Sequence, residues 1–127
     1  MAKPCKSCFL TVGNEVGKLA EIAAKLKEAG VNILALCAWT EGDTGKMLVC
    51  TTDNEKACSV LKTFGECGWK EGICVEADNR PGALQAIAAK LAGAGINIDL
   101  VYATATDAPK ARVVLHTSDN AKAAKLV

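Results

Sequence analysis

The chain contains one sequence pattern twice, and this repeat constrains the fold more than any other feature. Residues 14–30 read NEVGKLAEIAAKLKEAG and residues 79–95 read NRPGALQAIAAKLAGAG, an offset of 65 positions. The match continues beyond both segments, so that Val49 corresponds to Val114, and an extra residue near Ser118 then raises the offset to 66. Such a period is longer than that of the usual solenoid repeats. We therefore expect a duplication that produced two small domains.

Both copies show the same order of predicted strands and helices, because apolar residues recur at helical spacing between β-prone runs. The elements of the first copy are a strand at 9–12, a helix over 19–29, strands at 31–40 and 47–51, a helix after Asp53 and a strand near Trp69. Those of the second copy are a strand at 73–77, a helix over 84–94, strands at 96–106 and 112–117, and a helix after Ser118 or Asp119.

This order of elements predicts the fold class and the domain boundaries. A β-α-β-β-α-β unit is the ferredoxin-like plan, in which helices cover one face of an antiparallel sheet. We expect an α+β chain with two tandem units of this kind, at 1–68 and 69–127. The second copy reaches Val127 at about the end of its last helix, so we expect it to lack its last strand. The resulting sheet edge would stay open or be covered by a partner, which favours a homodimer.

Composition and charge argue against several classes of function. The chain has 15 Lys and Arg against 14 Asp and Glu, so it lacks the positive field that nucleic-acid binding requires. Phe9 is the only aromatic residue in the predicted central strands, too few for base stacking. No run approaches the roughly 18 apolar residues of a membrane span, and the N-terminus does not resemble a secretory signal. We expect a cytoplasmic protein without nucleic-acid or membrane partners.

The seven cysteines do not form a recognisable metal or redox site. Without export they are expected to be reduced thiols, mostly small core residues. Cys5 and Cys8 precede the first predicted strand, and two thiols supply half of a tetrahedral metal site. Thiol or metal handling by this pair remains an alternative function. His116, the only histidine, lies in a predicted strand, and no catalytic motif accompanies it. We therefore expect no enzymatic activity, no cofactor and no bound metal.

Two motifs flank the predicted long helix of the second copy, namely Asn79-Arg-Pro-Gly-Ala-Leu84 before it and Gly95-Ile-Asn-Ile98 after it. Their sequence and spacing resemble the ACT domain, a small-molecule regulatory module of amino-acid metabolism. The first copy keeps Asn14, Gly17 and Leu19 and then Gly30-Val-Asn-Ile33. It departs from the family pattern at Glu15 and Val16, where Arg and Pro are favoured. The resemblance covers nearly the whole chain as a tandem pair.

The residues of the motif suit the recognition of an α-amino acid. Pro81 fits a first helical turn because its φ is preset and it has no N–H. Gly82 permits close approach to the backbone, and the free N–H groups of a helix start favour a carboxylate. Asn79 offers donors and an acceptor to the other polar groups of a ligand. Because Glu15 replaces Arg80 in the first copy, we expect the loop around Arg80 to bind an anionic group better.

The resemblance also implies where the ligand lies. In ACT proteins that bind amino acids, the ligand commonly lies between two units placed side by side, so Asn79 would pair with Asn32 and Asn14 with Asn97. The candidate ligand-binding residues are Asn14, Gly17, Asn32, Ile33, Asn79, Arg80, Pro81, Gly82, Asn97 and Ile98. The expected protein is a regulatory module that signals to a separate enzyme or regulator. The alternative is a ligand-free structural or interaction module, because Asn before Pro-Gly is ordinary turn chemistry.

Overall fold

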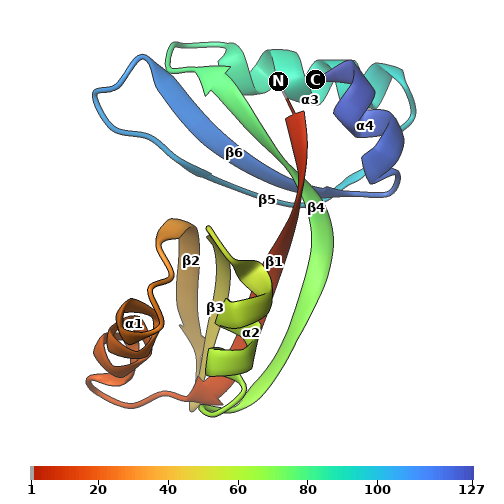
Figure 1. Cartoon of the computed structure of the whole chain (residues 1–127). Helices are drawn as coiled ribbons and strands as arrows, with labels where there is room; N and C mark the ends of the chain where they lie inside the picture. The colour runs from red at the N-terminus through yellow and green to blue at the C-terminus, as the bar shows by residue number, and fades with distance from the viewer. Residues whose placement is uncertain (1) are drawn as a thin grey trace. The chain divides into compact units, whose positions relative to one another are not determined.

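The computed structural model describes residues 2–127 and divides the chain into two compact units (Figure 1). The first unit is Lys6–Lys70, and the second unit combines residues 2–5 with Glu71–Val127. Two long strands, β1 (Ala2–Gly13) and β4 (Glu66–Asp78), therefore contribute one part to each unit. Each unit is a βαββαβ arrangement, so the α+β ferredoxin-like plan that the repeat predicts is confirmed.

In the first unit the strands follow the order β2-β3-β1-β4. Along the chain, β1 is followed by α1 (Lys18–Glu28), β2 (Ile33–Glu41), β3 (Thr44–Thr51) and α2 (Asn54–Leu61), and then by β4. Strand β3 pairs antiparallel with both β1 and β2. Helices α1 and α2 lie on one face of this sheet (Figure 1). The buried core between them consists of Leu, Ile, Val, Ala, Met and Cys side chains, with Phe64 packed against it, consistent with the scarcity of aromatic residues.

In the second unit the corresponding order is β5-β6-β4-β1. Its elements are the later part of β4, α3 (Ala83–Gly93), β5 (Ile98–Thr104), β6 (Lys110–Thr117) and α4 (Asn120–Leu126). Strand β6 pairs antiparallel with β4 and β5. Its core is built in the same way, around Ile73, Leu91 and Leu115, all nearly inaccessible to solvent. No helix within residues 2–127 has the length and apolar character needed to cross a membrane.

No strand follows α4 within residues 2–127, and the place of the expected last strand of the second repeat is filled by another segment. Residues 2–5 of β1 belong to the second unit, where β1 is hydrogen-bonded to β4. Ala2 packs against the core of that unit. The expectation that Cys5 and Cys8 precede the first strand is wrong, because both lie within β1. The N-terminal segment is therefore a structural part of the C-terminal repeat.

The strand register corrects one detail of the repeat alignment. Cys8 pairs with Val49 in the first unit, and its counterpart Ile73 pairs with Leu115 in the second. Val49 therefore corresponds to Leu115 rather than to Val114. The extra residue of the second copy lies in the β5–β6 hairpin and not near Ser118. A one-residue error in a strand exchanges the two faces of the sheet, so this shift decides which side chains reach the core.

The second helix of each unit begins with the same set of side-chain hydrogen bonds. The carboxylate of Asp53 accepts from the Lys56 backbone N–H at 3.1 Å, and that of Asp119 accepts from Lys122 at 3.0 Å. Asp119 rather than Ser118 is therefore the N-cap of α4. Aspartate satisfies N–H groups that the helix itself leaves without partners. These caps explain why short helices such as α2 and α4 begin at defined positions.

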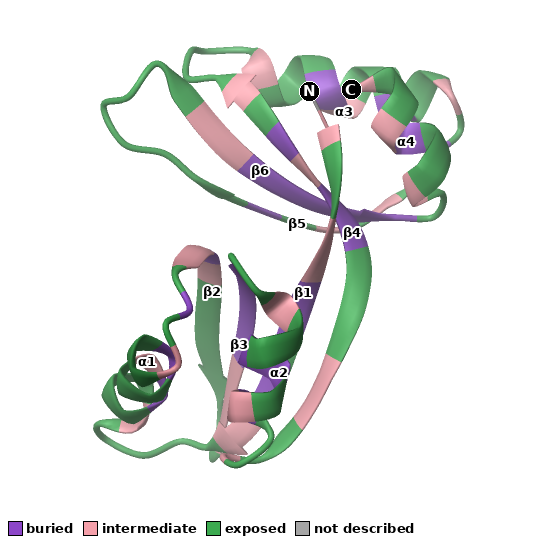
Figure 2. Ribbon diagram, in the orientation of Figure 1, coloured by how far each residue is buried: buried purple, intermediate pink, exposed green. Residues whose placement is uncertain are grey.

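Burial follows the predicted helix faces except in the first turn of α1 and α3 (Figure 2). Ile22 and Leu26 of α1 are buried, as are Ile87 and Leu91 of α3. By contrast, Leu19 and Leu84, which share their helical spacing, are about half exposed, at 52% and 49%. The start of each first helix therefore leaves apolar surface accessible, next to the loop that carries the sequence motif.

Candidate ligand-binding loops

The loop before each first helix ends in a β-turn whose third residue is a glycine. Gly17 has φ 86° and ψ −4°, and Gly82 has φ 88° and ψ −10°, which are the angles of position i+2 of a type II turn. The turns close through hydrogen bonds of 3.3 Å from Lys18 N–H to the Glu15 carbonyl and from Ala83 N–H to the Arg80 carbonyl. The two units thus have the same loop geometry despite their different sequences.

Pro81 occupies position i+1 of its turn, where its preset φ is favoured. The sequence placed Pro81 inside the first helical turn, and this is wrong, because α3 begins at Ala83 with Gly82 as N-cap. Neither Gly17 nor Gly82 can offer a side-chain acceptor to its helix. In contrast to α2 and α4, helices α1 and α3 therefore begin with N–H groups that have no capping side chain, a suitable environment for a carboxylate.

Asn14 and Asn79 hold these loops against the neighbouring hairpins. The side-chain amide of Asn79 donates to the carbonyl oxygens of Thr106 at 2.6 Å and Ala108 at 2.9 Å. That of Asn14 donates to the carbonyl of Gly42 at 3.2 Å. The structure thus gives the two predicted donors a local structural role. The amide oxygens of the two side chains take no part in these bonds.

Asn32 and Asn97 lie in the loops that follow α1 and α3. The backbone of each loop is held by a side-chain hydroxyl, since the Asn32 N–H donates to Thr52 Oγ1 at 3.1 Å and the Asn97 N–H donates to Ser118 Oγ at 2.9 Å. The Asn97 side chain also donates to the Asp99 carboxylate at 2.7 Å. Ile33 and Ile98 follow these asparagines, and each packs against the core of its own unit.

The two asparagines of one unit do not converge. Asn14 and Asn32 lie at opposite ends of α1, an 11-residue helix about 16 Å long, and Asn79 and Asn97 flank α3 in the same way. This distance exceeds the span between the carboxylate and ammonium groups of an amino acid. A single site that uses both kinds of asparagine must therefore draw them from two different units.

The first unit contains a hollow at each end of α1. A cavity of about 230 Å³ lies under the Asn14 loop and has a mainly apolar lining. Its lining residues include Leu10, Ile22, Met47, Leu19, Trp39 and Lys46. A second, more open hollow of about 350 Å³ includes Asn32 and Ile33. Asn14 thus borders one recess and Asn32 and Ile33 border the other, whereas Gly17 borders neither.

The hollow at the second hairpin is smaller and more polar. It measures about 170 Å³ and is bordered by Glu76, Lys110 and Arg112, together with the strand end around Thr104. Lys110 and Arg112 stand where the first unit has Thr44 and Lys46 in the corrected alignment. The two units therefore share loop geometry but differ in the chemistry of the adjacent surface.

Charges near both loops are neutralised within their own unit. Lys18 Nζ lies 3.3 Å from Glu15 and 3.4 Å from Glu21, and these hydrogen bonds raise the pKa of the Lys18 ammonium. In the second unit Lys110 lies 2.5 Å and Arg80 3.4 Å from the Asp78 carboxylate. Lys110 is the main cause of the lowered pKa of Asp78. The contrast between Glu15 and Arg80 is therefore weaker than the sequence suggests.

Sequence reasoning missed the wall that Trp39 builds beside the first loop. The indole Nε1–H of Trp39 donates to the Glu41 carboxylate at 3.3 Å, and Lys46 lies 2.8 Å from the same group. Lys46 and Trp39 together lower the pKa of Glu41. Trp39 is 40% exposed although it lies in a strand, and this exposure is the signal that marks the wall. The sequence alone does not reveal the exposure of a residue.

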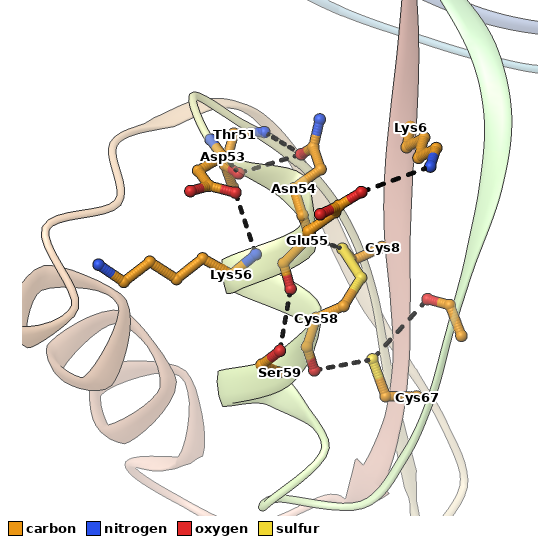
Figure 3. The surroundings of a disulfide bond; sticks show 11 residues. Lys6, Cys8, Thr51, Asp53, Asn54, Glu55, Lys56, Cys58, Ser59 and Cys67 are labelled. Carbon is orange, nitrogen blue, oxygen red and sulfur yellow. Dashed lines mark hydrogen bonds and ion pairs between the residues drawn. A yellow bond between two sulfur atoms is a disulfide. The ribbon is translucent and has the colours of Figure 1, made fainter.

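The cysteines differ most from expectation. Cys8 forms a disulfide with Cys58, so the expected pair of reduced thiols at Cys5 and Cys8 is wrong (Figure 3). Cys8 and Cys58 are 50 residues apart in the sequence, which explains why the spacing of the cysteines could not reveal the bond. Among residues 2–127 no cluster of metal-binding side chains occurs. His116 is 1% exposed, and its Nδ1 lies 2.8 Å from the Glu71 carbonyl, which fits the structural role expected for it.

Comparison with known proteins finds solved structures with this architecture. Neither a family model nor a curated protein matches the sequence. Among solved structures, protein BT0572 from Bacteroides thetaiotaomicron is similar over 98% of this chain and 87% of its own, with a TM-score of 0.86 and 27% identity. The regulatory subunit of aspartate kinase from Thermus thermophilus is similar over 99% and 94%, with a TM-score of 0.71 and 13% identity.

A third structure, the regulatory subunit of aspartate kinase from Thermus flavus, has a TM-score of 0.65 at 15% identity and covers 99% of this chain and 90% of its own. These likenesses extend over both units and not over one alone. They agree with the duplicated βαββαβ plan. The fold of this chain is that of a tandem ACT-domain protein.

Proposed function

We propose that the chain is a regulatory module that binds an amino acid where the helix-start loop of one ACT unit faces the strand start of another. The observation that carries this proposal is the recurrence of the same turn, with glycines at φ 86° and 88°, before a helix without a side-chain cap. A duplication preserved this geometry while the loop sequences diverged. In this account the chain catalyses no reaction and signals to a separate partner.

The loop chemistry is suited to both charged groups of an amino acid. The first-turn N–H groups of α1 and α3 would bind the carboxylate. Both amide hydrogens of Asn79 are used within its own unit, so its Oδ1 would accept from the ammonium group. Arg80 and Pro81 complete the second loop, and we keep the hypothesis that this loop binds the anionic group more strongly than the loop around Glu15.

The separation of the asparagines supports a site between units. Asn79 would work with Asn32 and Asn14 with Asn97, because the two members of one unit lie at opposite ends of a helix. Strands β2 and β5 are the outer strands of the hydrogen-bonded order and offer edges for a second copy. We therefore propose a homodimer in the cytoplasm, in which several such loop pairs can form.

A ligand-free interaction module is the second candidate function. It is favoured by one observation, namely that Asn14, Asn79 and Asn97 all donate hydrogen bonds within their own units. In that account the asparagines shape loops and bind nothing. The two candidates differ in whether any small metabolite stabilises the folded protein.

A thermal-shift panel of the common amino acids and purines separates the two candidates. A compound that binds only the folded state at a hundred times its Kd stabilises by about 2.7 kcal/mol, which is readily seen as a higher Tm. The regulatory proposal expects at least one amino acid to raise Tm in the wild type and less so in Asn97→Ala. If no compound raises Tm, the interaction module is the better account.

A further inference from the structure

The disulfide of the first unit connects a central strand to a helix in the interior of the fold. Cys8 on β1 is fully buried, and Cys58 on α2 is 6% exposed (Figure 3). In the second unit the corresponding residues are Ile73 and Ala124, which pack in its core. The same fold is thus built once with this bond and once without it. The bond is not a requirement of the βαββαβ plan, which leaves it available for reversible chemistry.

One side of this disulfide borders a surface cavity. A recess of about 200 Å³ is lined by Lys6, Asn54, Glu55, Cys58, Ser59, Lys62 and Trp69. Cys58 contributes to its wall, whereas Cys8 does not. A nucleophile that enters the recess therefore meets the Cys58 side of the disulfide first. This volume lies below the range of about 300–1,000 Å³ that is usual for drug-sized ligands, so the recess admits only a smaller molecule.

The charged groups around the recess favour an anion. Lys6 Nζ lies 4.0 Å from the Glu55 carboxylate and 4.1 Å from the centroid of the Trp69 ring. Lys62, at the end of α2, supplies a second cation from the same wall. Two ammonium groups against one carboxylate leave a positive balance beside Cys58. Such an environment stabilises a thiolate and any further negative charge on the molecule that carries it.

We propose that Cys58 is a site of thiol–disulfide exchange and that the recess receives a small thiol with an additional negative charge. The incoming thiolate attacks Cys58 Sγ, a new S–S bond forms between them, and the Cys8–Cys58 bond breaks. Cys8 Sγ leaves with the electron pair of that bond and takes up a proton from solvent. This proton balances the one that the incoming small thiol lost when it ionised. A second thiolate then attacks the sulfur of the attached small molecule, which leaves as a symmetrical disulfide, and Cys58 becomes a thiol.

The position of Cys8 suits the product of this reaction. Its Sγ lies 3.2 Å from the backbone carbonyl oxygen of Asn54. A disulfide sulfur has no proton, whereas a thiol at this place can donate to that carbonyl. The buried Cys8 therefore has an acceptor ready when the bond opens, and a buried donor without one would carry a penalty.

Cys67 lies near the disulfide but does not provide the nucleophile. Its Sγ is 4.0 Å from the Cys58 carbonyl and 3.7 Å from that of Gly68 (Figure 3). Burial raises the pKa of the Cys67 thiol, although nearby Lys62 opposes this effect. The thiol form predominates at neutral pH and is a poor nucleophile. The exchange therefore needs an external thiolate.

Three small thiols of different charge test the proposal on the oxidised wild-type chain. These are 2-mercaptoethanesulfonate, 2-mercaptoethanol and cysteamine, and the loss of the disulfide is followed by quenched mass spectrometry at low ionic strength. Corrected for thiolate fraction, the sulfonate should react faster than neutral 2-mercaptoethanol by about fivefold, the effect of one close charge pair in water, and the cation should react more slowly than 2-mercaptoethanol. Lys62→Gln should reduce this preference. Lys56→Gln, on the same helix but outside the recess, should not.

A trapping experiment identifies the sulfur that reacts. In Cys8→Ala the lone Cys58 thiol should form a mixed disulfide with bis(2-sulfonatoethyl) disulfide, whereas Cys8 in Cys58→Ala should stay unmodified. Exposed Cys37 reports reagent activity in both variants. Faster reaction of Cys8 than of Cys58 would overturn the proposal, and so would a charge preference unchanged by Lys62→Gln. If Cys8→Ala does not fold, as circular dichroism would reveal, the wild-type charge series decides.

Discussion

Asn79 and Thr106 are joined across the second unit, because the Asn79 side-chain amide donates to the Thr106 carbonyl oxygen at 2.6 Å. The same amide reaches Ala108, so this one side chain connects the candidate ligand loop to the tip of the neighbouring hairpin. Asn14 makes a single and longer bond of this kind in the first unit, to Gly42. The loop that is proposed to bind ligand is therefore also the point where hairpin and helix are held together.

Replacing Asn79 by alanine should destabilise the protein more than replacing Asn14. Two bonds are lost at Asn79 and one at Asn14, and each contributes about 0.5–1.5 kcal/mol in typical proteins. Urea unfolding of the two variants measures the difference. Equal destabilisation, or none at Asn79, would show that these hydrogen bonds do not hold the loop.

Substituting Gly82 or Gly17 by alanine should destabilise by about 1 kcal/mol, because both have positive φ, which costs an L-residue about that much. A Cβ at either position meets nothing within 4 Å, so the cost is conformational and not steric. Gly93 provides the matched control, since it lies in α3 and an added Cβ there is also without neighbours. Gly93→Ala should be neutral or stabilise by up to about 0.5 kcal/mol. A lower Tm for Gly93→Ala than for Gly82→Ala in thermal unfolding would contradict the assignment of the type II turn.

The general plan of the fold could be predicted from the sequence because the repeat is visible as residue identities. Duplicated helix-spaced apolar residues indicate the same unit twice, whatever the loops contain. Helix N-caps such as Asp53 also follow from local chemistry. These are short-range signals, and the structure confirms them.

Long-range features could not be predicted in this way. The pairing of residues 2–5 with the second unit depends on contacts with residues more than 60 positions away, and the Cys8–Cys58 bond spans 50 positions. The cavity beside Trp39 depends on where a strand face meets a helix start. The one-residue error at Val114 arose because the hairpin, where the extra residue lies, has no apolar pattern to align.

Deleting residues 2–5 should loosen the second unit and leave the first nearly unchanged, since these residues supply a strand beside β4. Hydrogen exchange should become faster at Ile73–Ala77 and stay the same at Met47–Cys50. Attaching the four residues after Val127 through a short flexible linker should restore protection, because the missing strand then returns from the other end. Unchanged exchange at Ile73–Ala77 in the deletion variant would contradict the structural role of the segment.

Acid should weaken the ion pair at the second hairpin. Lys110 and, to a lesser degree, Arg80 hold the pKa of Asp78 below the usual value for an aspartate. A carboxylate with a lowered folded-state pKa contributes stability at pH values above its unfolded pKa, and loses that contribution as the pH falls through the folded one. The loss should therefore begin only once the pH falls below the ordinary pKa of an aspartate, about 4.

An NMR titration of the Asp78 carboxyl carbon measures this effect directly. Lys110→Met should raise the pKa of Asp78, whereas Lys46→Met, which removes the comparable partner of Glu41 in the first unit, should not. If Asp78 titrates at the same pH with and without Lys110, the hairpin ion pair has no energetic effect in solution.

Amide chemical shifts of the isotopically labelled protein would report binding of an amino acid at the loops on both ends of α1 and α3. On addition of a mixture of the common amino acids, the account predicts shifts concentrated at 14–19, 32–33, 79–84 and 97–98. Asn97→Ala should diminish those at 97–98 together with those at 14–19, the loop proposed to face it. A spectrum that does not change, or that changes only elsewhere, would contradict the account.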